Sequence, residues 1–216
     1  FPGEQGGPHV NVFAGLALTF KIAKTPEFKA LQSQVIKNCV ALTDQLQQRG
    51  LRIPFGGTNT HLTNVDTKSI KGPTGTTLSG DMAARILDLA GIVVNRNTIP
   101  GDRSAMNPSG IRLGTPWITQ RGFKEEESRE LGNIIADVLQ ACIPYRERSA
   151  AKLSQRAKID FNALSEAKLR VRDLAQKAGI DFEPPKHGYP HFYYLDDKPQ
   201  SQADWVGLDV HGNEAR

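Results

Sequence analysis

The sequence predicts an α/β fold in which long helices pack on one small sheet. Two observations support this prediction: helical patterns alternate along the chain with short apolar runs of strand length, and glycine or proline stands at most of the boundaries. The chain has 216 residues, of which 38% are hydrophobic and 23% are charged. It is therefore long enough and apolar enough to bury a core.

Two helices are predicted at the start of the chain. Residues 10–24 follow a segment rich in glycine and proline and are mostly apolar, which favours a largely buried helix. Thr25 and Pro26 then supply an N-cap and a first-turn proline for a second helix over residues 26–49, which Gly50 ends. Its apolar residues recur every three or four positions and mark one face: Phe28, Leu31, Val35, Cys39, Leu42 and Leu46.

The middle of the chain alternates between the two element types. Helices are predicted over residues 79–90 and 123–141, and a polar loop over residues 95–109. Short strands are predicted at 51–53, 61–66, 92–94 and 110–114. This order predicts a small sheet with helices packed on it, one layer of an α/β sandwich.

After Pro144 the apolar periodicity weakens. Residues 145–158 are charged and are predicted as a helix, and a further helix is predicted over residues 165–178, ended by Gly179. We therefore expect a helical or irregular connector over residues 145–200, followed by the first residues of something that continues, over 201–216.

Composition excludes several classes of protein. No stretch approaches the ~20 apolar residues that a membrane span needs. The net charge of +4 is small and spread along the chain, so we expect neither a membrane nor a nucleic-acid partner. Cys39 and Cys142 stand in apolar helical patterns, which favours free thiols and a cytoplasmic location over a disulfide. Pro190 separates His187 from His191, and no metal site is expected.

A glycine-rich segment before the first helix is a candidate anion site. Gly6 and Gly7 leave backbone N–H groups accessible, and the helix N-terminus adds a favourable partial charge for phosphate. The alternative is a tight turn that only leads into the helix.

Arg112 is a candidate carboxylate receptor. Its strand places Ile111 and Leu113 on one face and the guanidinium on the other, with Gly110 and Gly114 leaving room on both flanks. The alternative is an edge-strand arginine paired with a carboxylate of the protein. The long polar loop before this strand is either a ligand contact or a solvated connection.

Five segments, in this order, resemble serine hydroxymethyltransferase, a pyridoxal-phosphate (PLP) enzyme of the fold-type I group. They read FPGEQGGPH from residue 1, GGTNTHL from 56, VNRNTIP from 94, SGIRLGTP from 109 and TQRGFKE from 119. The resemblance implies the C-terminal part of such a transferase, a small α/β sandwich lobe with long helices. Residues 1–25 would end the large PLP-binding domain and carry its phosphate loop, and residues 26–144 would form the small domain.

The resemblance also implies a reaction and its ligands. Serine plus tetrahydrofolate would be interconverted with glycine plus 5,10-methylenetetrahydrofolate, with PLP as cofactor. Arg112 would bind the amino-acid carboxylate. Gly6 and Gly7 would bind the PLP phosphate of the neighbouring subunit, so that a homodimer shares its sites. Folate would lie beside Asn97, Ser104, Ala105 and Met106.

Two features depart from the family pattern. The family's Schiff-base lysine follows a Thr-His pair, and no lysine of this chain does, so we expect this polypeptide alone to be inactive. Residues 205–216 resemble the opening of a glycine-cleavage T-protein (aminomethyltransferase) domain, which predicts a piece of a fusion or a truncated gene product.

Two alternative functions for the chain stay open. It could be a non-catalytic binding or dimerisation module, or part of a folate-dependent aminomethyltransferase.

Overall fold

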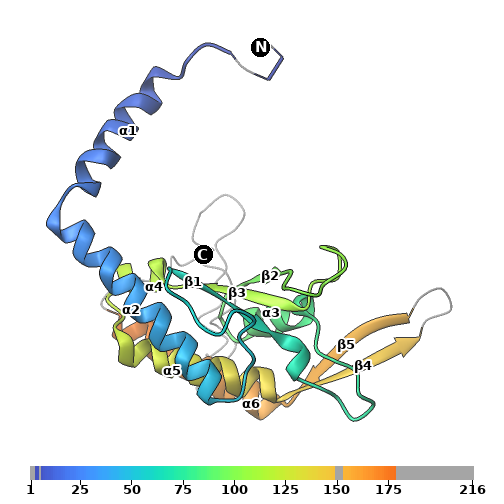
Figure 1. Ribbon diagram of the computed structural model, residues 1–216. Helices are drawn as coiled ribbons and strands as arrows, with labels where there is room; N and C mark the ends of the chain where they lie inside the picture. Colours follow the sequence, from blue (N-terminus) through green and yellow to red (C-terminus); the bar gives the residue numbers. More distant parts are fainter. Residues whose placement is uncertain (1–2, 5, 149–152, 179–216) are drawn as a thin grey trace, which may run out of the picture.

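The computed structural model describes residues 3–4, 6–148 and 153–178. A three-stranded sheet forms one layer, and helices form a second layer against one of its faces (Figure 1). An α/β arrangement is thus confirmed, and no helix among the described residues covers the opposite face of the sheet.

The sheet is antiparallel throughout and has the order β1-β3-β2. The strands are β1 (Leu62–Asp66), β2 (Asn95–Asn97) and β3 (Gly110–Gly114). The predicted strands at 61–66 and 110–114 are confirmed. The prediction of a strand at 92–94 is wrong, because the residues that pair with β3 are the next three. Residues 51–53 form no strand of their own, and only Arg52 bridges to Asp66.

The helices predicted between residues 26 and 141 are confirmed with shifts of a few residues at their ends. They are α2 (Pro26–Gln48), α3 (Gly80–Leu89) and α5 (Glu125–Gln140), joined by the short η1 (Thr67–Ser69) and α4 (Pro116–Gln120). Thr25 caps α2, since its hydroxyl accepts a hydrogen bond from the Phe28 N–H at 3.2 Å. Gly50 follows α2 with φ +82°, a conformation that favours glycine and ends the helix.

The core lies between the sheet and the helices. Ile111 and Leu113 of β3 and Val65 of β1 contribute one side of it. Helices α2, α3 and α5 contribute the other side through Leu42, Leu46, Ile86, Leu87, Ile134, Ile135, Val138 and Leu139. Burial of these side chains fixes which face of β3 points inward, and so fixes the direction of Arg112.

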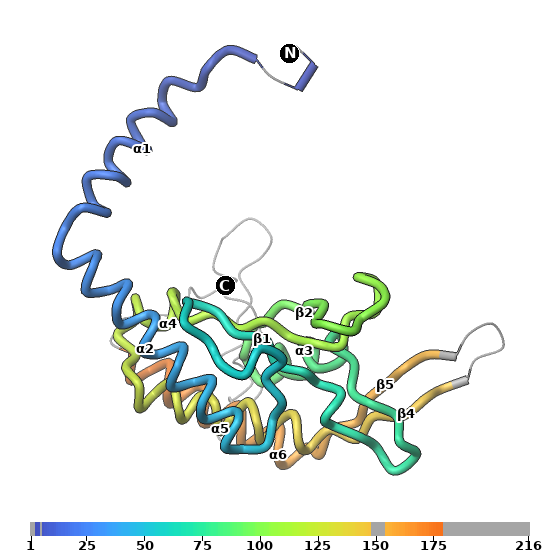
Figure 2. Tube along the Cα trace, in the orientation of Figure 1, coloured from blue at the N-terminus to red at the C-terminus, as the bar shows by residue number. Residues whose placement is uncertain are grey.

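Helix α1 (Val10–Ala23) confirms the predicted helix but not its burial. None of its residues is buried, and Val10, Phe20 and Leu18 expose 69%, 62% and 59% of their surface. Figure 2 shows the reason: α1 extends away from the body of the chain, where no described residue covers it. Burial of this helix therefore requires a surface that the described residues do not supply.

The predicted helix over residues 145–158 is wrong. Strands β4 (Cys142–Arg148) and β5 (Leu153–Ile159) pair there as an antiparallel hairpin. Asp160 then caps α6 (Phe161–Lys177) by accepting the Ala163 N–H at 2.9 Å, so the helix predicted at 165–178 starts four residues earlier. Residues 179–200 of the predicted connector and the segment predicted at 201–216 lie outside the described residues.

Helix α6 packs on the same core as α5. Ala167, Leu174 and Ala178 join the core, and Arg170 bonds to Glu130 and Asp137 of α5. No helix in the described part of the chain is long and apolar enough to cross a membrane.

Candidate functional site

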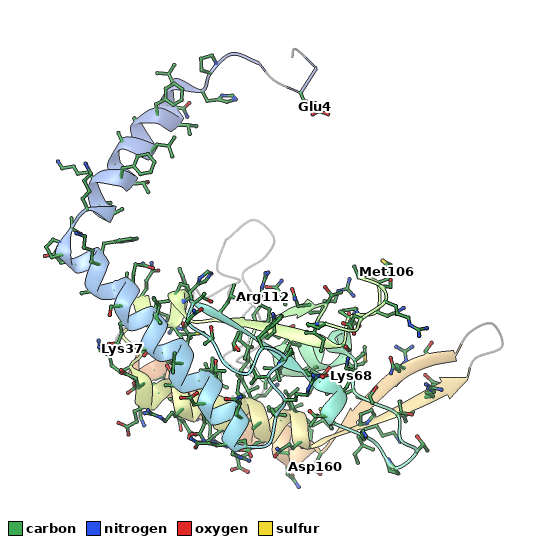
Figure 3. The ribbon with its side chains drawn as sticks, in the orientation of Figure 1. Glu4, Lys37, Lys68, Met106, Arg112 and Asp160 are labelled. Atoms are coloured by element: carbon green, nitrogen blue, oxygen red, sulfur yellow. The ribbon has the colours of Figure 1, made fainter. Side chains whose placement is uncertain are left out.

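The uncovered face of the sheet presents Arg112. Because side chains alternate along β3, Ile111 and Leu113 enter the core while Arg112 projects to the opposite side. Figure 3 shows Arg112 on the side of the sheet that faces away from α5 and α6. The predicted orientation of the guanidinium is confirmed.

Arg112 has no charge partner among the described residues. It makes no hydrogen bond or ion pair with any of them, whereas Arg49, Arg52, Arg85, Arg96, Arg156 and Arg170 each pair with a carboxylate. Strand β3 is also central and not an edge. Arg112 therefore does not stand on an edge strand, and within the described residues no carboxylate pairs with its exposed guanidinium.

Two asparagines flank Arg112 across the sheet. Asn64 of β1 and Asn95 of β2 are its register partners. Residues directly opposite each other on antiparallel strands share a face, so the three side chains form one row. Both neighbours are neutral and leave the positive charge in place. Sequence reasoning missed Asn64, since its only local signal is a polar residue beside Val65 in a short strand.

Room beside Arg112 is found on one flank only. A Cβ at Gly114 would meet only ordinary contacts, 3.6 Å from the His61 carbonyl oxygen and 3.7 Å from Pro116 Cδ. A Cβ at Gly110 would overlap Cγ2 of Ile99, which the loop after β2 folds back onto the strand. The expectation of free space on both flanks is thus wrong at Gly110, where the space is filled by packing.

The loop over residues 98–109 is held by Asp102. This carboxylate accepts the Ile99 N–H at 3.1 Å, the Ser109 N–H at 2.9 Å and the Ser109 hydroxyl, and it lies 3.7 Å from Lys68 Nζ. Burial alone would raise the pKa of Asp102, but the bonds from Ser109 and Ile99 and the charge of Lys68 outweigh it and lower the pKa. The loop is therefore anchored at both ends.

The predicted folate residues occupy two parts of this region. Asn97 pairs with Gly110 and lies on the Arg112 face of the sheet, with its amide donating to the Thr98 carbonyl at 2.7 Å. Ser104, Ala105 and Met106 are exposed in the outer part of the loop, and Met106 exposes 79% of its surface. Figure 3 shows Met106 well apart from Arg112.

Gly6 and Gly7 lie in the exposed segment before α1. Neither has a described atom within 4 Å of the position that a Cβ would take. The segment stands away from β3 in Figure 1, and the structure does not bring these glycines into one site with Arg112 of the same chain.

The comparisons with known proteins name the family. The family model for serine hydroxymethyltransferase matches residues 1–135. This chain belongs to the serine hydroxymethyltransferase family. The matched residues include α1, α2, the whole sheet and Arg112.

Individual relatives agree with this family. The chain is 51% identical to serine hydroxymethyltransferase of Cupriavidus taiwanensis over 140 residues, which is 64% of this chain and 32% of the relative. It is 48% identical to that of Myxococcus xanthus over 142 residues, 65% of this chain and 32% of the relative. With the serine hydroxymethyltransferase of Bombyx mori it shares 41% identity over 190 residues, 88% of this chain and 38% of the relative. The chain thus spans about a third of the length of these relatives.

Proposed function

We propose that the chain is the C-terminal part of a PLP-dependent serine hydroxymethyltransferase of fold-type I. The reaction interconverts serine plus tetrahydrofolate with glycine plus 5,10-methylenetetrahydrofolate. Family membership over residues 1–135 supports this proposal. The single observation that carries it is an exposed guanidinium on a central strand, with no carboxylate partner among the described residues. The family match does not favour a non-catalytic module or an aminomethyltransferase.

Arg112 would bind the carboxylate of serine or glycine. Its planar fork matches two carboxylate oxygens, and a bidentate pair fixes the direction of the amino acid as well as its position. Since Ile111 and Leu113 hold the strand in the core, the guanidinium is presented from a rigid base. This placement would orient the bonds at the substrate's Cα for reaction.

The residues present fit a share of a PLP site. Gly6 and Gly7 have no side chain and no described neighbour where a Cβ would stand, so their backbone is accessible to a phosphate. They would serve the site of a neighbouring subunit, which makes a homodimer part of the proposal. When bound, PLP supplies an electron sink for the substrate's Cα. The lysine that holds it would belong to residues outside this chain.

Folate would lie along the end of the sheet beyond β2. Asn97 shares the face of Arg112, and Ser104, Ala105 and Met106 provide an exposed loop surface between β2 and β3. Asp102 and Ser109 would set the distance between that loop and the strand that carries Arg112.

The location of the protein would be cytoplasmic. A fusion with a T-protein domain would begin in residues 201–216.

The decisive test is Arg112→Ala in the full-length protein loaded with PLP. We expect serine affinity, measured by calorimetry, to fall by about 2–5 kcal/mol, because a desolvated charge pair is lost. Arg129→Ala, on the exposed surface of α5, removes the same charge elsewhere and should leave the affinity unchanged. Unchanged serine affinity in Arg112→Ala, or no glycine formed by the wild type with tetrahydrofolate, would contradict the proposal.

A further inference from the structure

Asn64 stands beside Arg112, and its side chain makes no hydrogen bond to a described residue. The two residues are register partners on adjacent strands, and they lie on the face of the sheet opposite to Val65, Ile111 and Leu113. Cβ atoms of such partners are about 5 Å apart, so a carboxamide and a guanidinium at these positions reach the same ligand.

The side-chain carbonyl of Asn64 is an unsatisfied acceptor. Its Oδ1 is buried and has no hydrogen-bond partner within the described chain. A buried acceptor without a donor is costly, and structures retain few of them. The guanidinium of Arg112, in register with it, carries five N–H donors that no described residue uses.

Charge on this row explains why the neighbour is an amide. Asp66, two residues along β1 on the same face, is committed to Arg52 and to the Lys68 N–H. Asn64 and Asn95 are neutral, so neither quenches Arg112. An amide offers an acceptor to the guanidinium and two N–H donors to an anion, whereas an acid would compete with the anion for the guanidinium.

We propose that Asn64 is a second recognition group for the substrate carboxylate. When the carboxylate binds, Oδ1 of Asn64 would accept a hydrogen bond from the Arg112 guanidinium, a bond not formed in this structure. Its Nδ2 would donate to a carboxylate oxygen of the amino acid. The inference deepens the proposed function and rests on it, since the carboxylate is that of serine or glycine. It assigns substrate selectivity to a residue pair that spans two strands.

The test measures the affinity of the full-length, PLP-loaded protein for serine and for ethanolamine by calorimetry. Ethanolamine keeps the amine and hydroxyl of serine but has no carboxylate. Asn64→Leu should lower the affinity for serine about tenfold, because a hydrogen bond to a charged group is lost. It should leave the affinity for ethanolamine unchanged. Asn64→Asp, nearly isosteric, should weaken serine at least about a hundredfold, because the new carboxylate pairs with Arg112.

Thr63→Val is the matched control. Thr63 is the next residue of β1, and its buried hydroxyl also has no partner in the described chain, but it lies on the core side of the strand. Its removal should leave both affinities unchanged. Melting temperatures show whether each variant folds. If Asn64→Leu does not fold, the serine affinity of Asn64→Asp tests the inference.

Two results would overturn the inference alone. The first is a serine affinity within twofold of wild type in both Asn64 variants, while Arg112→Ala still binds serine more weakly. That result removes Asn64 from the site and leaves the proposed function intact. The second is an equal loss of affinity for serine and for ethanolamine in Asn64→Leu, which shows that Asn64 does not bind the carboxylate. If Arg112→Ala itself has no effect, it is the proposed function that fails.

Discussion

The Ser109 hydroxyl donates to the Asp102 carboxylate and closes the loop that precedes the Arg112 strand. The same carboxylate accepts two backbone N–H groups, from Ile99 and Ser109, so one side chain ties the end of β2 to the start of β3. The strand that carries Arg112 and the loop proposed for folate thus share a single anchor.

Replacing this anchor should destabilise the protein. Asp102→Asn keeps the shape but loses the charge that strengthens three hydrogen bonds, and we expect a loss of about 1–3 kcal/mol in the free energy of unfolding. Urea denaturation at neutral pH measures it. Asn107→Asp, which adds a charge in the exposed outer loop, is the control and should change stability little.

The stability difference between the wild type and Asp102→Asn should depend on pH. The pKa of Asp102 is lowered in the folded protein from its ordinary value of 3.8. Its stabilising contribution is therefore complete above that value and is lost as the pH falls through the lower, folded-state pKa. The wild type should lose its advantage over Asp102→Asn only below pH 3.8. A difference that vanishes already near pH 6 would show that another group is responsible.

Gly110 is predicted to tolerate no side chain. A Cβ there would overlap Cγ2 of Ile99 and lie 3.0 Å from the Asn97 carbonyl oxygen. We expect Gly110→Ala to cost about 1–3 kcal/mol, measured as a shift in thermal or urea unfolding. Gly114→Ala, on the same strand with only ordinary contacts, is the matched control and should be close to neutral. Adding Ile99→Ala to Gly110→Ala should cost less than the sum of the two changes.

Arg170 should contribute to holding α6 on α5. Its guanidinium lies 2.6 Å from Glu130 and 2.7 Å from Asp137, and Asp137 also bonds Arg49, the residue after α2, at 2.6 Å. Since the groups are partly exposed, we expect Arg170→Met to cost only about 1 kcal/mol in urea unfolding. Lys168→Met removes the same charge from α6 without breaking an ion pair to a described residue. An equal effect of both variants would assign the loss to net charge instead.

The two thiols should be unreactive in the folded protein. Burial raises the pKa of Cys142 to about 12 and is also the main reason that the pKa of Cys39 is raised. At pH 8 both groups therefore remain protonated and shielded. Ellman's reagent should titrate no thiol of this chain in the native state and both after denaturation. Rapid native labelling of Cys39 or Cys142 would contradict the buried positions of α2 and β4.

Sequence reasoning failed where pairing partners are distant. Residues 145–158 lack alternation and are rich in charge, so a helix was the local expectation, yet Tyr145 pairs with Arg156 in a hairpin. Residues 92–94 are apolar, but the polar Asn95–Asn97 strand pairs with β3. Local composition does not encode which backbone groups meet across a sheet, since strand pairing is a non-local interaction.

The sequence by itself determined the periodic elements, the ends of α2, the inward direction of Ile111 and Leu113, and the family to which five ordered motifs belong. Only the tertiary structure decided that Arg112 lacks a carboxylate partner among the described residues, that Ile99 fills one of its flanks, and that Asn64 stands beside it. Helical periodicity and capping are properties of adjacent residues. The ion pairs and neighbours of a side chain depend on segments that meet only when the chain is folded.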